Sequence, residues 1–414
     1  MKAFTGRLPC NGVCFKMIYM TGHFLNKVFI RITVFLLCLI LLKQAVAQRD
    51  TIEPRNFGIS FTVEAGKILK IYPVFPELKP ALISRLDLDW QTQGRQSWNK
   101  HFNYPVTGIQ LVYGSLGNND VLGTMAAVIP NLKFRLFPGH KGNVSLRFGM
   151  GFAWFSKPYD AFDNPENLLV GSAITNITSL QLMYSTGLFH AVQLQAGAGF
   201  LHFSNGHTQL PNVGINLPSL HLGLGYRPHY ERKEVDIRVD LMPSTDIKMN
   251  LEFGLGWHEF GETTEPTGGI KYPVYSVGIS LSKNTGYIHN WQLGLWLNHY
   301  ASFRDYIVSQ DFYDEQVWLN SSTLVLYAGH EFMLGRLGLD TKFGLYLYNP
   351  FRRKYNDDVL LKQNNFKELS SNKLGVNYYF FDTKTTRNGL FIGIHIKANL
   401  GQADFAEISA GYRF

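Results

Sequence analysis

Cysteine is almost absent from this sequence, and none occurs beyond residue 38. Its three cysteines, Cys10, Cys14 and Cys38, all lie near the start of the chain. The remainder of the chain therefore contains no disulfide and no thiolate nucleophile.

An excess of charge is also missing once residues 1–47 are set apart. The whole chain has a formal net charge of +8, from 39 basic and 31 acidic residues. Residues 1–47 hold six of the basic residues and none of the acidic ones, which leaves 33 basic against 31 acidic, a net charge of +2. Because binding to phosphate backbones depends on clustered positive charge, we expect no nucleic-acid partner.

Apolar runs long enough to cross a bilayer as a helix are absent too. The run ITVFLLCLILL, at 32–42, is shorter than the roughly 20 residues that such a helix needs. It follows basic residues and is followed by Ala45, Val46 and Ala47, the small-residue end that is typical of a secretory signal peptide. We predict a signal peptide over residues 1–47, cleaved before Gln48, with a membrane anchor as the alternative.

Alternation with a period of two is what the rest of the chain contains in abundance. In NGLFIGIHIKANL the apolar residues share one face, and His395, Lys397 and Asn399 lie on the other. In KMNLEFGLGWH one face is apolar, and Asn250 and Glu252 lie on the other; the apolar residues are Met249, Leu251, Phe253, Leu255 and Trp257. The segment EVDIRVDL at 234–241 alternates in the same way. This pattern predicts β-strands with one apolar and one polar face.

Two all-β folds produce such strands. A soluble sandwich buries the apolar face, whereas a transmembrane barrel turns it to lipid and its polar face to the lumen. The strands are about 10–13 residues long, as tilted membrane strands must be, and their inner faces carry charges. The final strand, FAEISAGYRF, has Ala406, Ile408, Ala410, Tyr412 and Phe414 on one face, and such an ending resembles the sorting signal of bacterial outer-membrane barrels. We predict a transmembrane antiparallel β-barrel in the outer membrane.

The number of strands follows less directly from the pattern. About seventeen segments alternate, yet single-chain bacterial barrels have an even number of strands. When alternating up and down directions are assigned to the strands from each end of the chain, the two assignments disagree between Lys233 and Lys271. We expect one domain over residues 48–414, a barrel of 12–16 strands with 14 as the central value, closed by the C-terminal strand. Long outer loops are expected at 157–174, 301–318 and 348–371.

A histidine and a serine end one of the predicted strands. In VQLQAGAGFLHFSN the residues Ala198, Phe200, His202 and Ser204 have the same parity, so both polar side chains continue the outward, apolar face. Adjacent side chains at i and i+2 bring an imidazole near a hydroxyl that it can deprotonate. The pair alone is more typical of the polar fringe of a barrel strand than of a catalytic site.

The surrounding block HFSNGHTQLPNVGIN resembles the signature of the lipid A 3-O-deacylase family, also called acyloxyacyl hydrolases. The match comprises His202, Ser204, Asn205, Pro211, Asn212, Gly214 and Ile215. The resemblance implies an outer-membrane barrel that removes an ester-linked acyl chain from lipopolysaccharide. It also implies Ser204 as nucleophile, His202 as general base, and backbone N–H groups beside Asn205 and Gly206 as the oxyanion site.

The chain departs from the family pattern at the third catalytic position, where Asn216 stands in place of an acid. Extrapolating the parity of Leu220 and Leu222 places Asn216 on the outward face. An amide can orient an imidazole but cannot stabilise its charged form. In a serine protease the acid-to-amide change lowers kcat by about four orders of magnitude. The chain is also about twice as long as the small eight-stranded deacylases and is similar in length to the larger homologues of Bacteroidetes-type bacteria.

The leading hypothesis is therefore an outer-membrane carboxylic ester hydrolase acting on lipid A through Ser204, His202 and Asn216. The alternative is a non-enzymatic barrel, either a porin-like channel or a catalytically impaired relative, and a phospholipid hydrolase is a third hypothesis. The histidines at 190–229 have no spacing typical of metal ligands, and no phosphate-binding or dinucleotide motif occurs. We expect no cofactor and no metal, with lipopolysaccharide or a related membrane lipid as the partner.

Overall fold

The computed structural model describes residues 56–70, 75–94, 96–138, 142–227, 244–265, 267–360, 368–383 and 386–414. The predicted signal peptide at 1–47 and the alternating segment at 234–241 lie outside these residues. No helix among them is long and apolar enough to cross a membrane.

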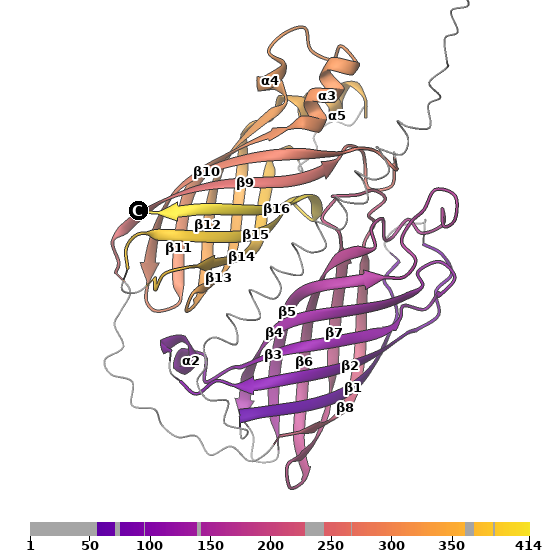
Figure 1. The fold of residues 1–414 in the computed structure, drawn as a ribbon, viewed down its shortest axis with the longest axis vertical. Helices are drawn as coiled ribbons and strands as arrows, with labels where there is room; N and C mark the ends of the chain where they lie inside the picture. The colour runs from indigo at the N-terminus through magenta and orange to yellow at the C-terminus, as the bar shows by residue number, and fades with distance from the viewer. Residues whose placement is uncertain are drawn as a thin grey trace, which may run out of the picture. The chain divides into compact units, whose positions relative to one another are not determined.

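The first eight strands form a closed antiparallel barrel in which each strand pairs with its sequence neighbour and β1 pairs with β8 (Figure 1). The strands are β1 Phe57–Gly66, β2 Ala81–Gln91, β3 Val106–Ser115, β4 Thr124–Pro138, β5 Asn143–Phe155, β6 Ile174–Phe189, β7 Val192–Ser204 and β8 Ile215–Tyr226. The short helix α2, Ser97–His101, lies on the connection from β2 to β3.

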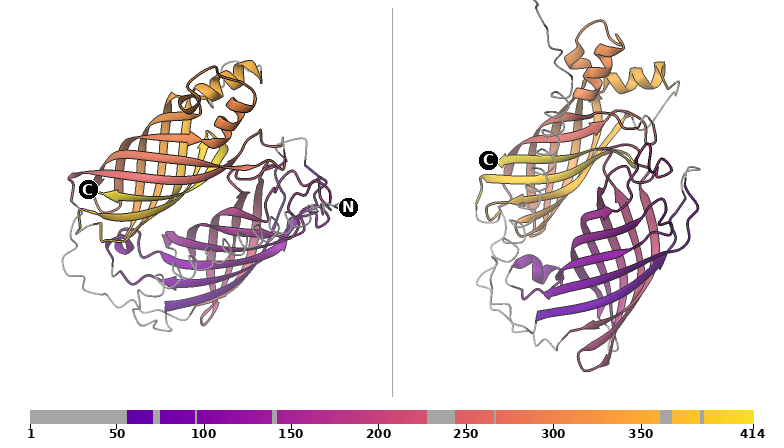
Figure 2. Two further views of the ribbon diagram at one scale, coloured as in Figure 1. Left: turned by 45° about the horizontal axis from the view of Figure 1, so that its top comes forward. Right: turned by 45° about the vertical axis from the view of Figure 1, so that its right-hand side comes forward.

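The last eight strands form a second closed barrel, in which the C-terminal strand β16 pairs with β9 (Figures 1 and 2). The strands are β9 Ile247–Glu259, β10 Lys271–Thr285, β11 His289–Tyr300, β12 Ser322–Leu334, β13 Leu337–Tyr348, β14 Ser370–Tyr379, β15 Gly389–Asn399 and β16 Gln402–Arg413. Helices α3 Ala301–Ser309, α4 Val317–Asn320 and α5 Pro350–Asp358 gather at one end of this barrel (Figure 1). They occupy two of the three expected long loops.

The all-β, antiparallel barrel class is confirmed, but the expectation of one barrel with about 14 strands is wrong. The described residues contain sixteen strands that close as two barrels of eight. The break falls between Tyr226 and Ile247, which overlaps the stretch from Lys233 to Lys271 where the assigned strand directions disagreed. Alternation is a local property of each strand, whereas closure depends on pairs such as Phe61–Leu224 and Leu255–Ile408 that are far apart in sequence.

The predicted faces of the strands are confirmed in both barrels. On β15, His395, Lys397 and Asn399 are buried inside, whereas Leu390 and Ile394 are exposed outside. Charges inside the first barrel are paired: the guanidinium of Arg147 contacts Asp87 and lies 2.9 Å from Asp89. An eight-stranded barrel is just wide enough for its side chains to fill the interior, and these inner charges are buried rather than water-exposed.

Candidate active site

The outward face of the first barrel carries the three predicted catalytic side chains. His202 and Ser204 lie on β7 with the same parity as Phe200, which is 38% exposed, while the intervening Leu201 and Phe203 are buried. Asn216 on β8 shares its parity with the exposed Leu220. His202 and Asn216 are register partners across the two strands, so pairing of the strands places their side chains beside each other.

The imidazole of His202 contacts Asn216 through one ring nitrogen. His202 Nδ1 lies 2.8 Å from Asn216 Oδ1. Because an amide oxygen can only accept, this hydrogen bond requires the proton on Nδ1 and leaves the Nε2 lone pair free. Asn216 therefore selects the tautomer that a general base needs, although it brings no negative charge.

The hydroxyl of Ser204 accepts two hydrogen bonds from the loop that follows β7. The N–H of Gly206 donates to Ser204 Oγ at 3.2 Å, and the Asn212 amide nitrogen Nδ2 donates at 3.0 Å. Gly206 has a φ of +68°, a left-handed conformation that glycine adopts without steric cost. Two N–H donors thus converge on the oxygen of the candidate nucleophile.

The predicted oxyanion donors beside Asn205 and Gly206 have different surroundings. The N–H of Gly206 faces Ser204, but the N–H of Asn205 donates to Asn212 Oδ1 at 3.2 Å. Asn212 is the residue whose role the sequence reasoning missed, since its side chain both orients this turn and donates to Ser204. Its only sequence signal was its place in the motif, eight residues beyond the serine, because no periodicity applies within a loop.

The loop at residues 205–214 is held on two sides. Backbone N–H groups of Val213 and Gly214 donate to the carbonyls of Leu168 and Leu169 in the loop after β5. Residues 259–263 supply partners on another side: Leu210 N–H donates to Glu259 Oε2 at 2.9 Å, and the Asn212 N–H donates to the carbonyl of Thr263 at 2.9 Å.

His207 adds a ring contact to the same loop. Its Nε2 lies 3.2 Å from the carbonyl oxygen of Gly261, and its ring stacks on that of His258 with centroids 5.5 Å apart. Burial lowers the pKa of His207, so at neutral pH this ring is uncharged and its Nε2–H donates to the carbonyl. The loop that positions Asn212 is therefore fixed by residues outside the first barrel as well as within it.

Comparison with known proteins gives one match on each barrel. Residues 84–226 match the family model described as "Lipid A 3-O-deacylase (PagL)", and residues 247–414 match the one described as "Acyloxyacyl hydrolase, C-terminal domain". No curated protein sequence matches the chain.

Solved structures of barrels are also similar to parts of the chain. The "outer membrane enzyme PagL" is 17% identical over 40% of this chain and 97% of its own, with a TM-score of 0.27. A triple mutant of Rhodopseudomonas blastica porin is 10% identical over 86% of this chain and 99% of its own, with a TM-score of 0.17.

Proposed function

Because this chain belongs to the lipid A 3-O-deacylase (acyloxyacyl hydrolase) family, we propose that it is an outer-membrane hydrolase that removes an ester-linked acyl chain from lipid A. The observation that supports this most is the outward position of the contact between His202 and Asn216 beside Ser204. A lipid ester held in the bilayer reaches such a site directly, without entering a lumen.

The nucleophilic step follows from the tautomer of His202. With Nδ1–H bound to Asn216, the Nε2 lone pair takes the hydroxyl proton of Ser204 as Oγ attacks the ester carbonyl carbon. The attack joins Oγ to the carbonyl carbon, and the former carbonyl oxygen of this tetrahedral intermediate carries the negative charge. The imidazolium returns its proton to the departing sugar oxygen, and a water activated by His202 then hydrolyses the acyl-serine.

The oxyanion is stabilised by the donors that converge on Ser204. The N–H of Gly206 and the Nδ2–H of Asn212 both point at Oγ, and we assign them to the oxyanion that develops on the carbon that Oγ attacks. Donors fixed before the reaction stabilise such charge most in surroundings that exclude water. Asn212 is 7% exposed, which meets this condition.

We expect Asn212→Ala to lower kcat by about 10²–10³-fold, the usual cost of losing one oxyanion donor, with a smaller change in KM. The measurement is ester hydrolysis by the purified chain in mixed detergent–lipopolysaccharide micelles. Asn372→Ala in the second barrel, where the amide donates to the Leu400 carbonyl, is the matched control. An unchanged kcat for Asn212→Ala contradicts the assignment of this donor.

Glu259 is a positioning residue in this proposal. Its carboxylate accepts hydrogen bonds from the N–H groups of Leu210, at 2.9 Å, and Gly269, at 2.7 Å. Glu259→Ala removes both acceptors from the loop that carries Asn212, and we expect kcat to fall about tenfold, since bonds to a charged acceptor are the stronger ones. Glu259→Gln keeps one acceptor oxygen and restores part of the loss.

Two measurements distinguish positioning from a general loss of stability. Limited proteolysis detects loosening of residues 205–214, and the thermal midpoint reports the stability of the whole fold. A fall in kcat with an unchanged midpoint and faster cleavage in the loop supports the assignment. Equal kcat in Glu259→Ala and the unmodified chain rejects it.

A channel is the alternative that the charged inner faces suggested. Many of the described inner charges of both barrels are buried in ion pairs, as for Arg147 with Asp89 and for Lys373 with Glu407 at 2.7 Å. Ion pairs that fill eight-stranded barrels leave no wide aqueous path. A catalytically impaired relative is the alternative that the uncharged Asn216 favours, and the substitutions of that residue test it.

A further inference from the structure

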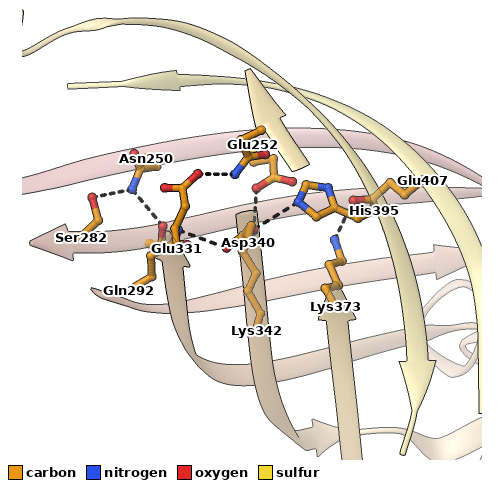
Figure 3. Close-up of polar contacts among 12 residues, drawn as sticks. Asn250, Glu252, Ser282, Gln292, Glu331, Asp340, Lys342, Lys373, His395 and Glu407 are labelled. Carbon is orange, nitrogen blue, oxygen red and sulfur yellow. Dashed lines mark hydrogen bonds and ion pairs between the residues drawn. The ribbon is translucent and has the colours of Figure 1, made fainter. Parts of the chain in front are cut away.

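Three potential metal ligands meet inside the second barrel. Glu252 of β9, His395 of β15 and Glu407 of β16 come from three strands that are consecutive around the barrel. One ligand atom of each residue lies within 4.8 Å of those of the other two. Figure 3 shows the two carboxylates beside the imidazole.

Each of these residues has a buried polar atom without a hydrogen-bond partner. The atoms are Oε1 of Glu252, Nδ1 of His395 and Oε2 of Glu407. His395 and Glu407 are each only 1% exposed. Buried polar atoms are nearly always paired, and three unpaired acceptors in one cluster call for a bound cation or proton.

The other polar atom of each residue is already occupied. His395 Nε2 lies 3.1 Å from Asp340 Oδ2, a carboxylate contact that places the ring proton on Nε2 and leaves the Nδ1 lone pair available. Lys373 Nζ lies 2.7 Å from Glu407 Oε1, and Lys342 Nζ lies 3.1 Å from Glu252 Oε2. Such outer contacts are what orient the ligands of metal sites.

The charge of this cluster also favours a cation. The three carboxylates of Glu252, Asp340 and Glu407 face only two ammonium groups, those of Lys342 and Lys373, so negative charge exceeds positive charge by one among these five side chains. Imidazole nitrogen together with carboxylate oxygen suits Zn²⁺, which in sites that keep one open position is bound by three side chains and one water. A small cavity borders one of the three ligands, Glu252, together with Lys342 and Lys373.

We propose that Glu252, His395 and Glu407 form a binding site for a divalent transition metal of the Zn²⁺ type. The bound ion joins β15, β16 and β9, the strands around the closure of the second barrel. Its role is structural: it pairs the three unpaired atoms and links the C-terminal strand to the first strand of its barrel. This site is independent of the hydrolase proposal, because none of its residues contacts Ser204, His202 or Asn216 among the described residues.

Metal analysis of the full chain in detergent tests the proposal. After chelator treatment and dialysis against Zn²⁺, we expect one tightly held Zn²⁺ per chain and a higher thermal midpoint, with no such rise in Mg²⁺. His395→Gln removes the imidazole ligand and abolishes binding. His221→Gln is the matched control, since His221 is a buried histidine of the first barrel with both ring nitrogens unpaired; it keeps the Zn²⁺ stoichiometry.

A further variant covers the case in which His395→Gln fails to fold. Asp340→Asn keeps all three ligands and weakens their orientation, so we expect a 10–100-fold loss of Zn²⁺ affinity. Co²⁺ in place of Zn²⁺ gives visible absorption that reports nitrogen–oxygen ligation. The proposal is overturned if the chain retains no Zn²⁺ and its thermal midpoint does not change with added Zn²⁺. Equal Zn²⁺ binding by His395→Gln and the unmodified chain overturns it as well.

Discussion

Ser204→Ala is expected to abolish deacylation, with kcat falling by about 10²–10⁶-fold, where the upper figure is the loss in a serine hydrolase whose catalytic acid is present. The reason is that no other described hydroxyl in this site has both a histidine as strand neighbour and two N–H donors directed at its oxygen. Expression of the unmodified chain in a Gram-negative host, followed by mass spectrometry of its lipid A, gives the readout: the mass of one acyl chain is lost from lipid A.

The alanine variant should restore the fully acylated mass. Ser172→Ala serves as the control, because Ser172 is a partly exposed loop residue whose hydroxyl donates to the carbonyl of Ile174. The ester-hydrolase proposal fails if lipid A has the same acylation pattern with the unmodified chain and with Ser204→Ala. If the unmodified chain leaves lipid A intact but hydrolyses a phospholipid ester, and Ser204→Ala does not, the substrate class is wrong while the chemistry stands.

Asn216→Asp is expected to raise kcat, in the opposite direction to most active-site substitutions. A carboxylate at this position keeps the 2.8 Å contact with His202 Nδ1 and adds a charge that stabilises the imidazolium formed as Ser204 loses its proton. The reverse change in a serine protease lowers kcat about 10⁴-fold, so an increase of roughly 10–10⁴-fold is expected here. Initial rates of ester hydrolysis measure it.

Asn216→Ala provides the opposite control, because it removes both the charge and the hydrogen bond. We expect it to be slower than the unmodified chain, since His202 then loses the group that fixes its tautomer. The series alanine, asparagine, aspartate therefore rises in kcat if Asn216 orients the base. Equal rates for all three residues would show that the 2.8 Å contact has no catalytic role.

The strands and their two faces were predictable because apolar and polar residues alternate within the sequence of each strand. The alternation in NGLFIGIHIKANL predicted a strand, and β15 covers Gly389–Asn399 of that segment. The same parity placed His202 and Ser204 outside, and it extended across Pro218 to Asn216, whose side chain does contact the imidazole. In these cases the information lies within a dozen residues, and the pleat of the strand converts it directly into direction.

Features that depend on distant residues were not predictable in this way. Closure into two barrels depends on pairing of β1 with β8 and of β9 with β16, and strands in one large barrel would show the same alternation. The hydrogen bond between Leu210 and Glu259 joins a loop residue of the first barrel to a strand residue of the second. Likewise the cluster of Glu252, His395 and Glu407 joins residues separated by up to 155 positions, so no ligand spacing was visible.

The outward position of His202, Ser204 and Asn216 has a consequence for the kinetics of the proposed reaction. A substrate that stays in the leaflet reaches this wall by lateral diffusion in two dimensions. The relevant quantity is then the mole fraction of acylated lipid in the surrounding surface, rather than its amount per volume of solution. Adding inert amphiphile should slow turnover even when the number of enzyme and substrate molecules is unchanged.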